Sequence, residues 1–342
     1  MSMIRVGIIS PSEIAFRRFL PALSKLADIH FAGIAVANEG EWEGITQSIL
    51  KNEREKADDF VKLYGGKAYD SYQEIIESDD VDALYIPLPP SLHYKWAKKA
   101  LLANKHILVE KPATTSLEQT RELISLAKEK NLAVHENYMF VFHNQLSVIN
   151  EIIKDHEIGE VRLFRMSFGF PRRASTDFRY NKKLGGGALL DCGGYTIKYA
   201  SFLLGDTARI VYANLNYTDE FDVDIYGSAA LVNESGMTVQ LSFGMDNSYK
   251  CELEVWGSQG SLKTNRVFTA PPGFEPELSI NNEKGAEVRK LPSDDTFMKS
   301  ITRFQKAISD QIIRNDIYEE ILKQAHLVDE YVRKVNCNQN EE

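Results

Sequence analysis

Short apolar segments alternate with helical patterns over the first 137 residues, and this alternation constrains the fold more than any other feature of the sequence. The segments are rich in Val, Ile and Ala on both faces: Ile4–Ile9, Phe31–Val36, Asp82–Pro87, His106–Val109 and Ala133–Asn137. Strands of this kind are typical of a parallel sheet that is covered by helices on both sides. Residues 1–137 are therefore predicted to form an α/β domain with a doubly wound parallel sheet.

The pattern changes after residue 137, where strand-like segments follow one another without intervening helices. They are Val161–Phe170, Ile210–Tyr217, Asp222–Asn233, Met237–Met245 and Cys251–Trp256. Residues 233–236 (Asn-Glu-Ser-Gly) have the composition of a tight hairpin turn. Residues 138–342 are therefore predicted to form an α+β domain with a large, mostly antiparallel sheet, and with helices near Ala188–Leu204, Asp294–Ile313 and Ile317–Val335.

Composition excludes several classes of protein. The formal net charge of −9 argues against nucleic acid or an anionic membrane as a partner. No run of about 18 uncharged apolar residues occurs, and a strand candidate begins directly after the N-terminus, so neither a membrane span nor a signal peptide is expected. The cysteines (Cys192, Cys251 and Cys337) have neither metal-ligand nor disulfide-framework spacing. We expect a cytoplasmic protein without a metal site.

The turn after the first strand is where a doubly wound domain meets the pyrophosphate of a dinucleotide. Against the pattern G-x-G-x-x-G/A this turn offers Ser10, Ser12 and Ala15, of which only the last conforms. Serine allows close approach and its hydroxyl can donate to phosphate. The turn is compatible with a phosphate site, and also with a plain connection between strand and helix.

The end of the second strand bears on the choice of cofactor. An acid there would bind the ribose hydroxyls of NAD and repel the 2′-phosphate of NADP. The strand ends at Ala37 and Asn38 without such an acid, although Glu39 follows. The sequence therefore favours NADP over NAD.

The strongest chemical signal is the tripeptide Glu110-Lys111-Pro112. A lysine at the carboxyl end of a central strand points into the crevice where such sheets bind ligands, and the following proline restricts its backbone. A solvated charge pair is the alternative for an isolated tripeptide of this kind. Its position after the fourth strand–helix unit favours a functional lysine.

A second candidate lies where three glycines precede a predicted helix. Asp191 and Tyr195 are four residues apart and share one helical face. Hydride addition to a carbonyl gives an alkoxide that needs a proton, and a phenol beside a cation can donate one. We therefore expect Lys111 and Tyr195 to meet at the same reacting oxygen, with either of them as the proton donor. The alternative is that Tyr195 is only a core aromatic.

These motifs, together with Gly7-Ile-Ile near the start, resemble the glucose–fructose oxidoreductase, inositol dehydrogenase and rhizopine-catabolism (Gfo/Idh/MocA) family of NAD(P)-dependent oxidoreductases. The likeness covers essentially the whole chain. It implies a Rossmann domain, a second domain whose sheet supports homodimers or homotetramers, and catalysis by Lys111, Asp191 and Tyr195. The cofactor would be bound at the strand ends by Ser10, Ser12, Glu13, Ile14, Ala37, Asn38, Pro87, Leu88, His93, Glu110 and Lys111. From its position alone, His93 is expected to pack or cap rather than to catalyse.

Within the family the chain is most similar to the C-3 ketoreductases of dTDP-deoxysugar pathways. The matching stretches include Phe178-Arg-Tyr180 and Leu184–Asp191. This resemblance implies reduction of a 3-keto group on a nucleotide-linked sugar with NADPH, and a substrate site that includes Asn137, Arg172, Arg179, Tyr180 and Asp191.

The charge between Pro171 and Lys183 supports an anionic substrate independently. Five basic residues stand there against one acid, Asp177, just before the helix of Asp191. Arginine suits a diphosphate because of its forked donors, although a solvated loop is the alternative. Two other functions remain open: an NADP-dependent aldose or trans-dihydrodiol dehydrogenase that acts on an uncharged substrate, and a non-catalytic, cofactor-binding regulatory protein.

Overall fold

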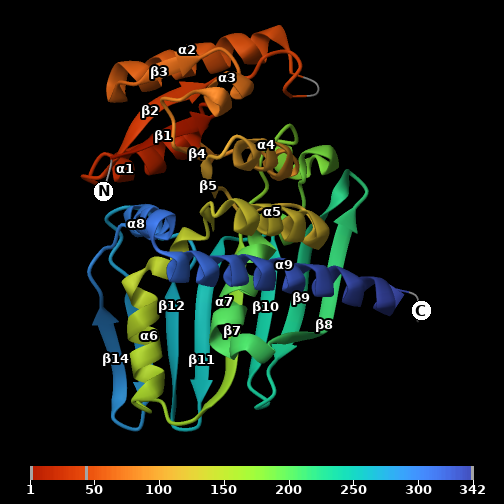
Figure 1. The fold of residues 1–342 in the computed structure, drawn as a ribbon. Helices are drawn as coiled ribbons and strands as arrows, with labels where there is room; N and C mark the ends of the chain where they lie inside the picture. Colours follow the sequence, from red (N-terminus) through yellow and green to blue (C-terminus); the bar gives the residue numbers. More distant parts are fainter. Residues whose placement is uncertain (1–2, 43–44, 340–342) are drawn as a thin grey trace. The chain divides into compact units, whose positions relative to one another are not determined.

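A parallel sheet and a larger mixed sheet form the framework of the protein in a computed structural model that describes residues 3–42 and 45–339 (Figure 1). The chain divides into two compact units. The first comprises Met1–Asn137 and Phe297–Leu322, and the second comprises Tyr138–Thr296 and Lys323–Glu342. The predicted fold class, a doubly wound parallel sheet plus an α+β domain with a mostly antiparallel sheet, is confirmed.

The first unit contains six parallel strands in the order β3-β2-β1-β4-β5-β6. They are β1 (Ile4–Ile9), β2 (Ile29–Ala35), β3 (Lys67–Tyr69), β4 (Ala83–Ile86), β5 (His106–Val109) and β6 (Val134–Glu136). The connections run outward from β1 in both directions, and because such crossovers are right-handed they place helices on opposite faces of the sheet. Sheets of this type bind ligands where the direction reverses, which here is between β1 and β4.

Helices follow these strands and bury one apolar side each. They are α1 (Leu20–Leu23), α2 (Gln47–Tyr64), α3 (Tyr72–Glu77), α4 (Pro90–Leu102) and α5 (Leu117–Lys130). On α4, for example, Trp96, Ala97 and Ala100 are fully buried at helical spacing. Across the described ranges, no helix combines the length and the apolar character that a membrane crossing requires.

Residues from late in the chain complete the first unit. They belong to α8 (Thr296–Ser309) and to the first part of α9 (Gln311–Gln339). The Ser300 hydroxyl donates to Asn137 Oδ1 (2.8 Å) and lies 2.8 Å from His135 Nε2. The Tyr318 hydroxyl donates to the Leu132 carbonyl. Because of these contacts, the compact units are not the two contiguous stretches 1–137 and 138–342.

The second unit contains an eight-stranded sheet in the order β14-β13-β12-β11-β7-β10-β9-β8. β10 and β7 are parallel and the other neighbours are antiparallel. The strands are β7 (Val161–Gly169), β8 (Arg209–Thr218), β9 (Phe221–Val232), β10 (Thr238–Gly244), β11 (Lys250–Gly257), β12 (Gly260–Asn265), β13 (Glu277–Asn282) and β14 (Gly285–Lys290). The predicted hairpin joins β9 to β10, with Gly236 at φ 82°.

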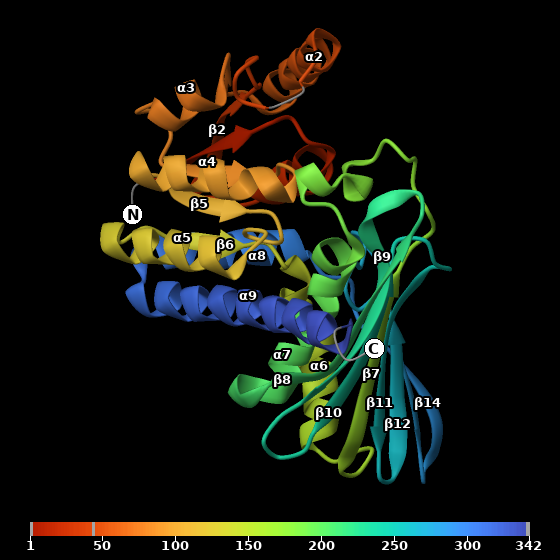
Figure 2. The same ribbon diagram turned by 90° about the vertical axis from the view of Figure 1, so that its right-hand side faces the viewer.

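One face of this sheet carries α6 (Asn144–Lys154) and α7 (Gly194–Leu204), as the edge-on view in Figure 2 shows. The predicted helix Ala188–Leu204 begins with a π-helical turn, Leu189–Gly193, before α7. Within the described part of the chain, no helix covers the opposite face. That face carries the exposed side chains of Tyr226 and Trp256.

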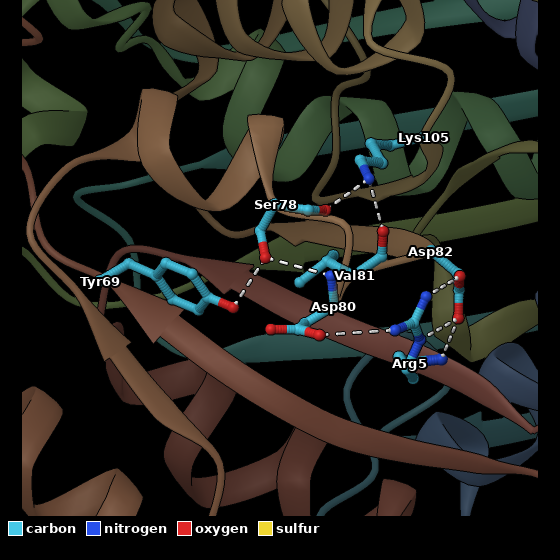
Figure 3. Close-up of polar contacts among 7 residues, drawn as sticks. All are labelled: Arg5, Tyr69, Ser78, Asp80, Val81, Asp82 and Lys105. Atoms are coloured by element: carbon cyan, nitrogen blue, oxygen red, sulfur yellow. Dashed lines mark hydrogen bonds and ion pairs between the residues drawn. The ribbon is translucent and has the colours of Figure 1, made fainter.

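The amino-terminal edge of the six-stranded sheet is held by a cluster of charged residues (Figure 3). Arg5 Nε and Nη2 donate to the two carboxylate oxygens of Asp82 (3.0 and 2.8 Å). Lys105 is buried, and its Nζ donates to the carbonyls of Ser78 and Val81, both at 2.7 Å. The cluster joins the starts of β1, β4 and β5 at the edge opposite the expected ligand site.

Lys105→Met should lower the free energy of unfolding by roughly 2–3 kcal/mol, because two carbonyls lose their donor while the apolar stem is kept. Urea unfolding followed by circular dichroism measures the change. Lys62→Met, at an exposed position of α2, is the matched control and should change stability by less than about 0.5 kcal/mol. Equal stability of the two variants would contradict the role given to Lys105.

Candidate functional site

The carboxyl ends of the parallel strands bring the expected cofactor-binding residues of the first unit to one edge of its sheet. β1, β2, β4 and β5 run in the same direction, so the residues that follow them meet at this edge. They are Ser10, Ser12, Glu13 and Ile14 after β1, Ala37 and Asn38 after β2, Pro87 and Leu88 after β4, and Glu110 and Lys111 after β5.

The turn after β1 has a left-handed backbone at Ser10, whose φ is 77°. The Ser10 amide donates to the Ala35 carbonyl (3.0 Å), and the Ser10 hydroxyl donates to Glu53 Oε1 on α2 (2.9 Å). The Ser12 hydroxyl accepts from the Ala15 amide (3.2 Å). The hydroxyl proton of Ser10, which the sequence offered to a phosphate, is therefore given to Glu53.

A cavity of about 520 Å³ lies beside the end of β2. Ala37 and Asn38 line it, together with the charged side chains of Glu39, Lys51, Arg54, Glu55 and Asp70. Glu53 Oε2 accepts from the Ala37 amide at 3.4 Å. An acid therefore does stand at the end of β2, but it comes from α2.

Sequence reasoning missed Glu53, although one signal was available. Glu53, Ala57 and Phe60 lie on one face of α2, and the last two are buried. An acid on an apolar helical face points to a specific partner. Burial raises the pKa of Glu53, and the hydrogen bonds from Ser10 and Ala37 oppose that rise.

His93 connects two of the turns at this edge. Its Nδ1 lies 2.7 Å from the Pro112 carbonyl and its Nε2 lies 2.7 Å from the Leu88 carbonyl. Burial lowers the pKa of His93 to about 4, and the contacts with the two carbonyls oppose this shift. With both ring nitrogens against carbonyls, the packing role suits His93 better than a contact to a cofactor.

Glu110 is the centre of a buried polar network. Its Oε1 accepts from the Tyr85 hydroxyl and from Asn137 Nδ2, both at 2.6 Å. The Asn137 Oδ1 in turn accepts from Ser300. Burial raises the pKa of Glu110, and the hydrogen bonds and the charge of Lys111 oppose this rise. Asn137, expected at the substrate, thus has its amide engaged by Glu110 and Ser300.

Lys111 follows β5 directly and precedes Pro112 across a cis peptide bond. Burial is the main cause of the shifts at Glu110 and His93; the charge of Lys111 opposes the rise in the pKa of Glu110 and adds to the fall in the pKa of His93.

In the second unit, Asp191 lies in the π-helical turn before α7 and forms an ion pair. Arg179 Nε donates to Asp191 Oδ2 at 2.7 Å, and Arg179 Nη1 contacts Asp177 Oδ1 at 3.1 Å. Burial is the largest single influence on the pKa of Arg179 and lowers it, but the two carboxylates together raise the pKa above its usual value. Arg179, expected at the substrate, is thus already paired with two acids.

The glycines before this helix allow close packing of protein backbone. A Cβ on Gly186 would lie 2.3 Å from the Arg179 carbonyl oxygen, and a Cβ on Gly187 would lie 2.4 Å from Asp224 Oδ1. Asp224 Oδ2 accepts from the Leu189 amide at the start of the helix (2.6 Å). Burial raises the pKa of Asp224 to about 6. No sequence motif pointed to Asp224, which contacts a helix some 35 residues earlier in the chain.

Tyr195 is 8% exposed and packs among aromatic rings. Its ring centroid lies 5.2 Å from that of Phe168, 5.3 Å from that of Tyr138 and 5.6 Å from that of Phe140. These contacts hold the ring in one orientation. A phenol fixed in this way is pre-oriented for hydrogen bonding.

The basic loop before Asp191 is partly neutralised by nearby acids. Arg172 is ion-paired with Glu220 and lies over the Phe221 ring. The Tyr180 hydroxyl donates to the Met245 carbonyl (3.1 Å) and accepts from the Arg173 amide (3.0 Å). Tyr180 therefore holds the loop through its hydroxyl.

In residues 3–42 and 45–339, no group of three or more His, Cys, Asp or Glu side chains could hold a metal ion.

Comparison with known proteins identifies relatives over nearly the whole chain. Residues 22–138 match the model of an oxidoreductase family with an NAD-binding Rossmann fold, and residues 147–263 match the GFO/IDH/MocA C-terminal domain. A dTDP-3,4-didehydro-2,6-dideoxy-alpha-D-glucose 3-reductase from Actinomadura kijaniata is 39% identical, covering 95% of this chain and 94% of that protein. The same activity is named for a relative from Saccharopolyspora spinosa, 33% identical over 98% of both chains.

The fold also matches a solved 3-ketoreductase from Actinomadura kijaniata in complex with NADP and TDP-benzene. The TM-score is 0.88, with 38% identity and 96% coverage of each chain. Further structures of that ketoreductase carry a single lysine or tyrosine substitution.

Asp224→Asn should change how stability depends on pH. The folded state binds the Asp224 proton more tightly than the unfolded state does, so this group favours folding below pH 4 and loses that contribution between pH 4 and 6. The loss is at most roughly 3 kcal/mol. Relative to wild type, the asparagine variant should become more stable as pH rises through this window.

Thermal unfolding of both proteins from pH 4 to 8 measures the difference in melting temperature. A difference that stays constant across that range would contradict the assignment. Asp222→Asn on the same strand, at an exposed position, is the control and should show no such change.

Proposed function

The chain belongs to the Gfo/Idh/MocA family of oxidoreductases, as its motifs indicated, and on that basis we propose that it reduces a 3-keto group on a nucleotide-linked deoxysugar with NADPH. One observation carries the proposal. The substituted lysine and tyrosine of the solved ketoreductase are separated by the same number of residues as Lys111 and Tyr195. We infer that these residues are the counterparts of that pair.

The proposed cofactor site is the carboxyl edge of the six-stranded sheet, at the turn after β1 that contains Ser12. When bound there, the nicotinamide dinucleotide supplies the hydride. The cavity beside β2 is lined by Lys51 and Arg54, but these are ion-paired with Glu55 and Asp70. Support for NADP comes instead from the solved ketoreductase, which holds NADP.

We propose that Lys111 and Tyr195 both act on the carbonyl oxygen of the substrate. As hydride arrives at carbon, negative charge grows on that oxygen, and an ammonium stabilises it. The proton then comes from Tyr195 or from Lys111. Asp191 is held as an anion by Arg179, so it serves to orient rather than to donate a proton.

We further propose that the protein is cytoplasmic and assembles into homo-oligomers. The thiols of Cys192 and Cys251 are buried, which suits a reducing cytoplasm. The exposed rings of Tyr212, Tyr226 and Trp256 lie on strands of the eight-stranded sheet and suit a homodimer or homotetramer. Residues 1–137 would serve cofactor binding, and 138–342 substrate binding and assembly.

An aldose or dihydrodiol dehydrogenase with an uncharged substrate is the competing function. The pairing of Arg172 with Glu220, and of Arg179 with Asp177 and Asp191, favours it, because paired arginines attract a diphosphate less strongly.

Lys111→Ala should reduce turnover of NADPH with a dTDP-linked 3-keto sugar by roughly 10²–10⁴-fold, because the charge and donor at the carbonyl oxygen are lost. The Kd for NADPH, measured by its fluorescence, should stay within about threefold. Tyr195→Phe should likewise lower kcat. Lys284→Ala, an exposed control, should leave both quantities unchanged. Loss of NADPH binding together with activity would contradict the catalytic role.

Arg172→Gln combined with Arg173→Gln should raise KM for the dTDP-linked sugar about tenfold. This rise should shrink as salt increases, because the lost interaction is electrostatic. Steady-state rates at 50 and 300 mM NaCl measure it, with Arg209→Gln on an exposed position as control. An unchanged KM, with efficient oxidation of a free aldose, would favour the competing function.

A further inference from the structure

The turn after β1 departs from the usual dinucleotide fingerprint at its first position. That position normally carries glycine, because the tight turn brings the backbone into a conformation that glycine adopts readily. Here Ser10 has a φ of 77° and is only 5% exposed. A non-glycine residue is strained in this region unless surrounding contacts hold it.

Ser10 is held by one side-chain hydrogen bond, to a carboxylate, and by backbone hydrogen bonds. The Ser10 hydroxyl donates to Glu53 Oε1 at 2.9 Å, and the other carboxylate oxygen accepts from the Ala37 amide at 3.4 Å. Ser10 N also donates to Ala35 O at 3.0 Å. Glu53, which lies 43 positions after Ser10, thus connects the residue after β1 to the residues after β2.

A hydrogen bond from a hydroxyl to a partly buried carboxylate is stronger than one between neutral groups, so it can offset the backbone strain at Ser10. The bond is made only when Ser10 is in the turn, so it favours the left-handed conformation over the alternatives. Of the amides that follow, Ser12 N donates to the Ser10 carbonyl (2.9 Å) and Ala15 N donates to the Ser12 hydroxyl (3.2 Å), so hydrogen bonds within the turn fix its shape before the helical turn Ala15–Phe19.

We infer that the Ser10–Glu53 contact replaces the missing fingerprint glycine, so that Glu53 is a positioning residue for the turn that receives the dinucleotide pyrophosphate. The inference rests on the proposed NADPH-dependent function. Glu53 acts through Ser10, and its effect concerns the pyrophosphate that NADPH and NADH share.

A double-mutant cycle in the full-length protein tests this inference. The variants are Glu53→Ala, Ser10→Gly and the combination of the two, and the measurement is the Kd for NADPH and for NADH by isothermal titration calorimetry. Glu53→Ala should weaken both cofactors by a similar factor of about ten. In the Ser10→Gly background the same change should cost less than about twofold, because glycine holds the turn without support.

Two further variants separate positioning from general damage. Glu53→Gln keeps an acceptor for Ser10 and should weaken binding less than Glu53→Ala does. Asp59→Ala removes an exposed carboxylate from the same helix and should leave both Kd values unchanged. Far-ultraviolet circular dichroism and thermal unfolding establish that each variant is folded.

The outcomes are distinct. Equal weakening by Glu53→Ala in both Ser10 backgrounds would overturn the inference, as would an effect confined to NADPH, which would assign Glu53 to the ribose end. Wild-type protein that binds neither cofactor would instead overturn the proposed function.

Discussion

The buried carboxylate of Glu110 is the contact on which the end of β5 depends. Two donors, the Tyr85 hydroxyl and the Asn137 amide, reach the same oxygen at 2.6 Å. A carboxylate removed from water is tolerated only when such donors replace its hydration, and removal of one partner leaves the other buried and unpaired. Tyr85 belongs to β4 and Asn137 follows β6, so Glu110 holds the ends of three neighbouring strands in register. Lys111 is the next residue and follows this anchored position directly.

Carboxylates have the same supporting role elsewhere in each unit. Glu53 holds Ser10 and Ala37, and Asp224 holds the start of the helix that carries Asp191 and Tyr195. Both acids have raised pKa values because burial outweighs their hydrogen bonds. By contrast, Arg5 lowers the pKa of Asp82 at the opposite edge of the first sheet. The two edges of the first sheet therefore differ electrostatically. The amino-terminal edge is stabilised by the ion pair of Arg5 and Asp82, whereas Glu53 and Glu110 at the carboxyl edge are partly removed from water and have raised pKa values.

Sequence patterns were sufficient for features that depend on neighbouring residues. The long strands, the hairpin after β9 and the strand-end position of Lys111 follow from local periodicity and turn composition. Four strands, β3, β12, β13 and β14, were not predicted. Two of the three β3 residues are exposed and β14 is exposed over most of its length, so neither shows alternating burial. β12 and β13 do alternate, and were missed although the pattern was present. Glu53 and Asp224 were missed for a different reason. Glu53 lies 43 positions from Ser10, and Asp224 lies 35 positions from Leu189. Only the folded chain shows that these residues are in contact.

The basic loop shows why a count of charges along the chain is insufficient. Arg179 and its partner Asp191 are 21% and 12% exposed, so breaking that pair would leave a charge in a poorly hydrated position. Arg172 and Glu220 are 40% and 52% exposed, and exposed pairs of this kind contribute at most about 1 kcal/mol. A diphosphate can therefore displace Glu220 from Arg172 at little cost but cannot readily separate Arg179 from Asp191. If the substrate is nucleotide-linked, Arg172 binds it and Arg179 keeps Asp191 in place.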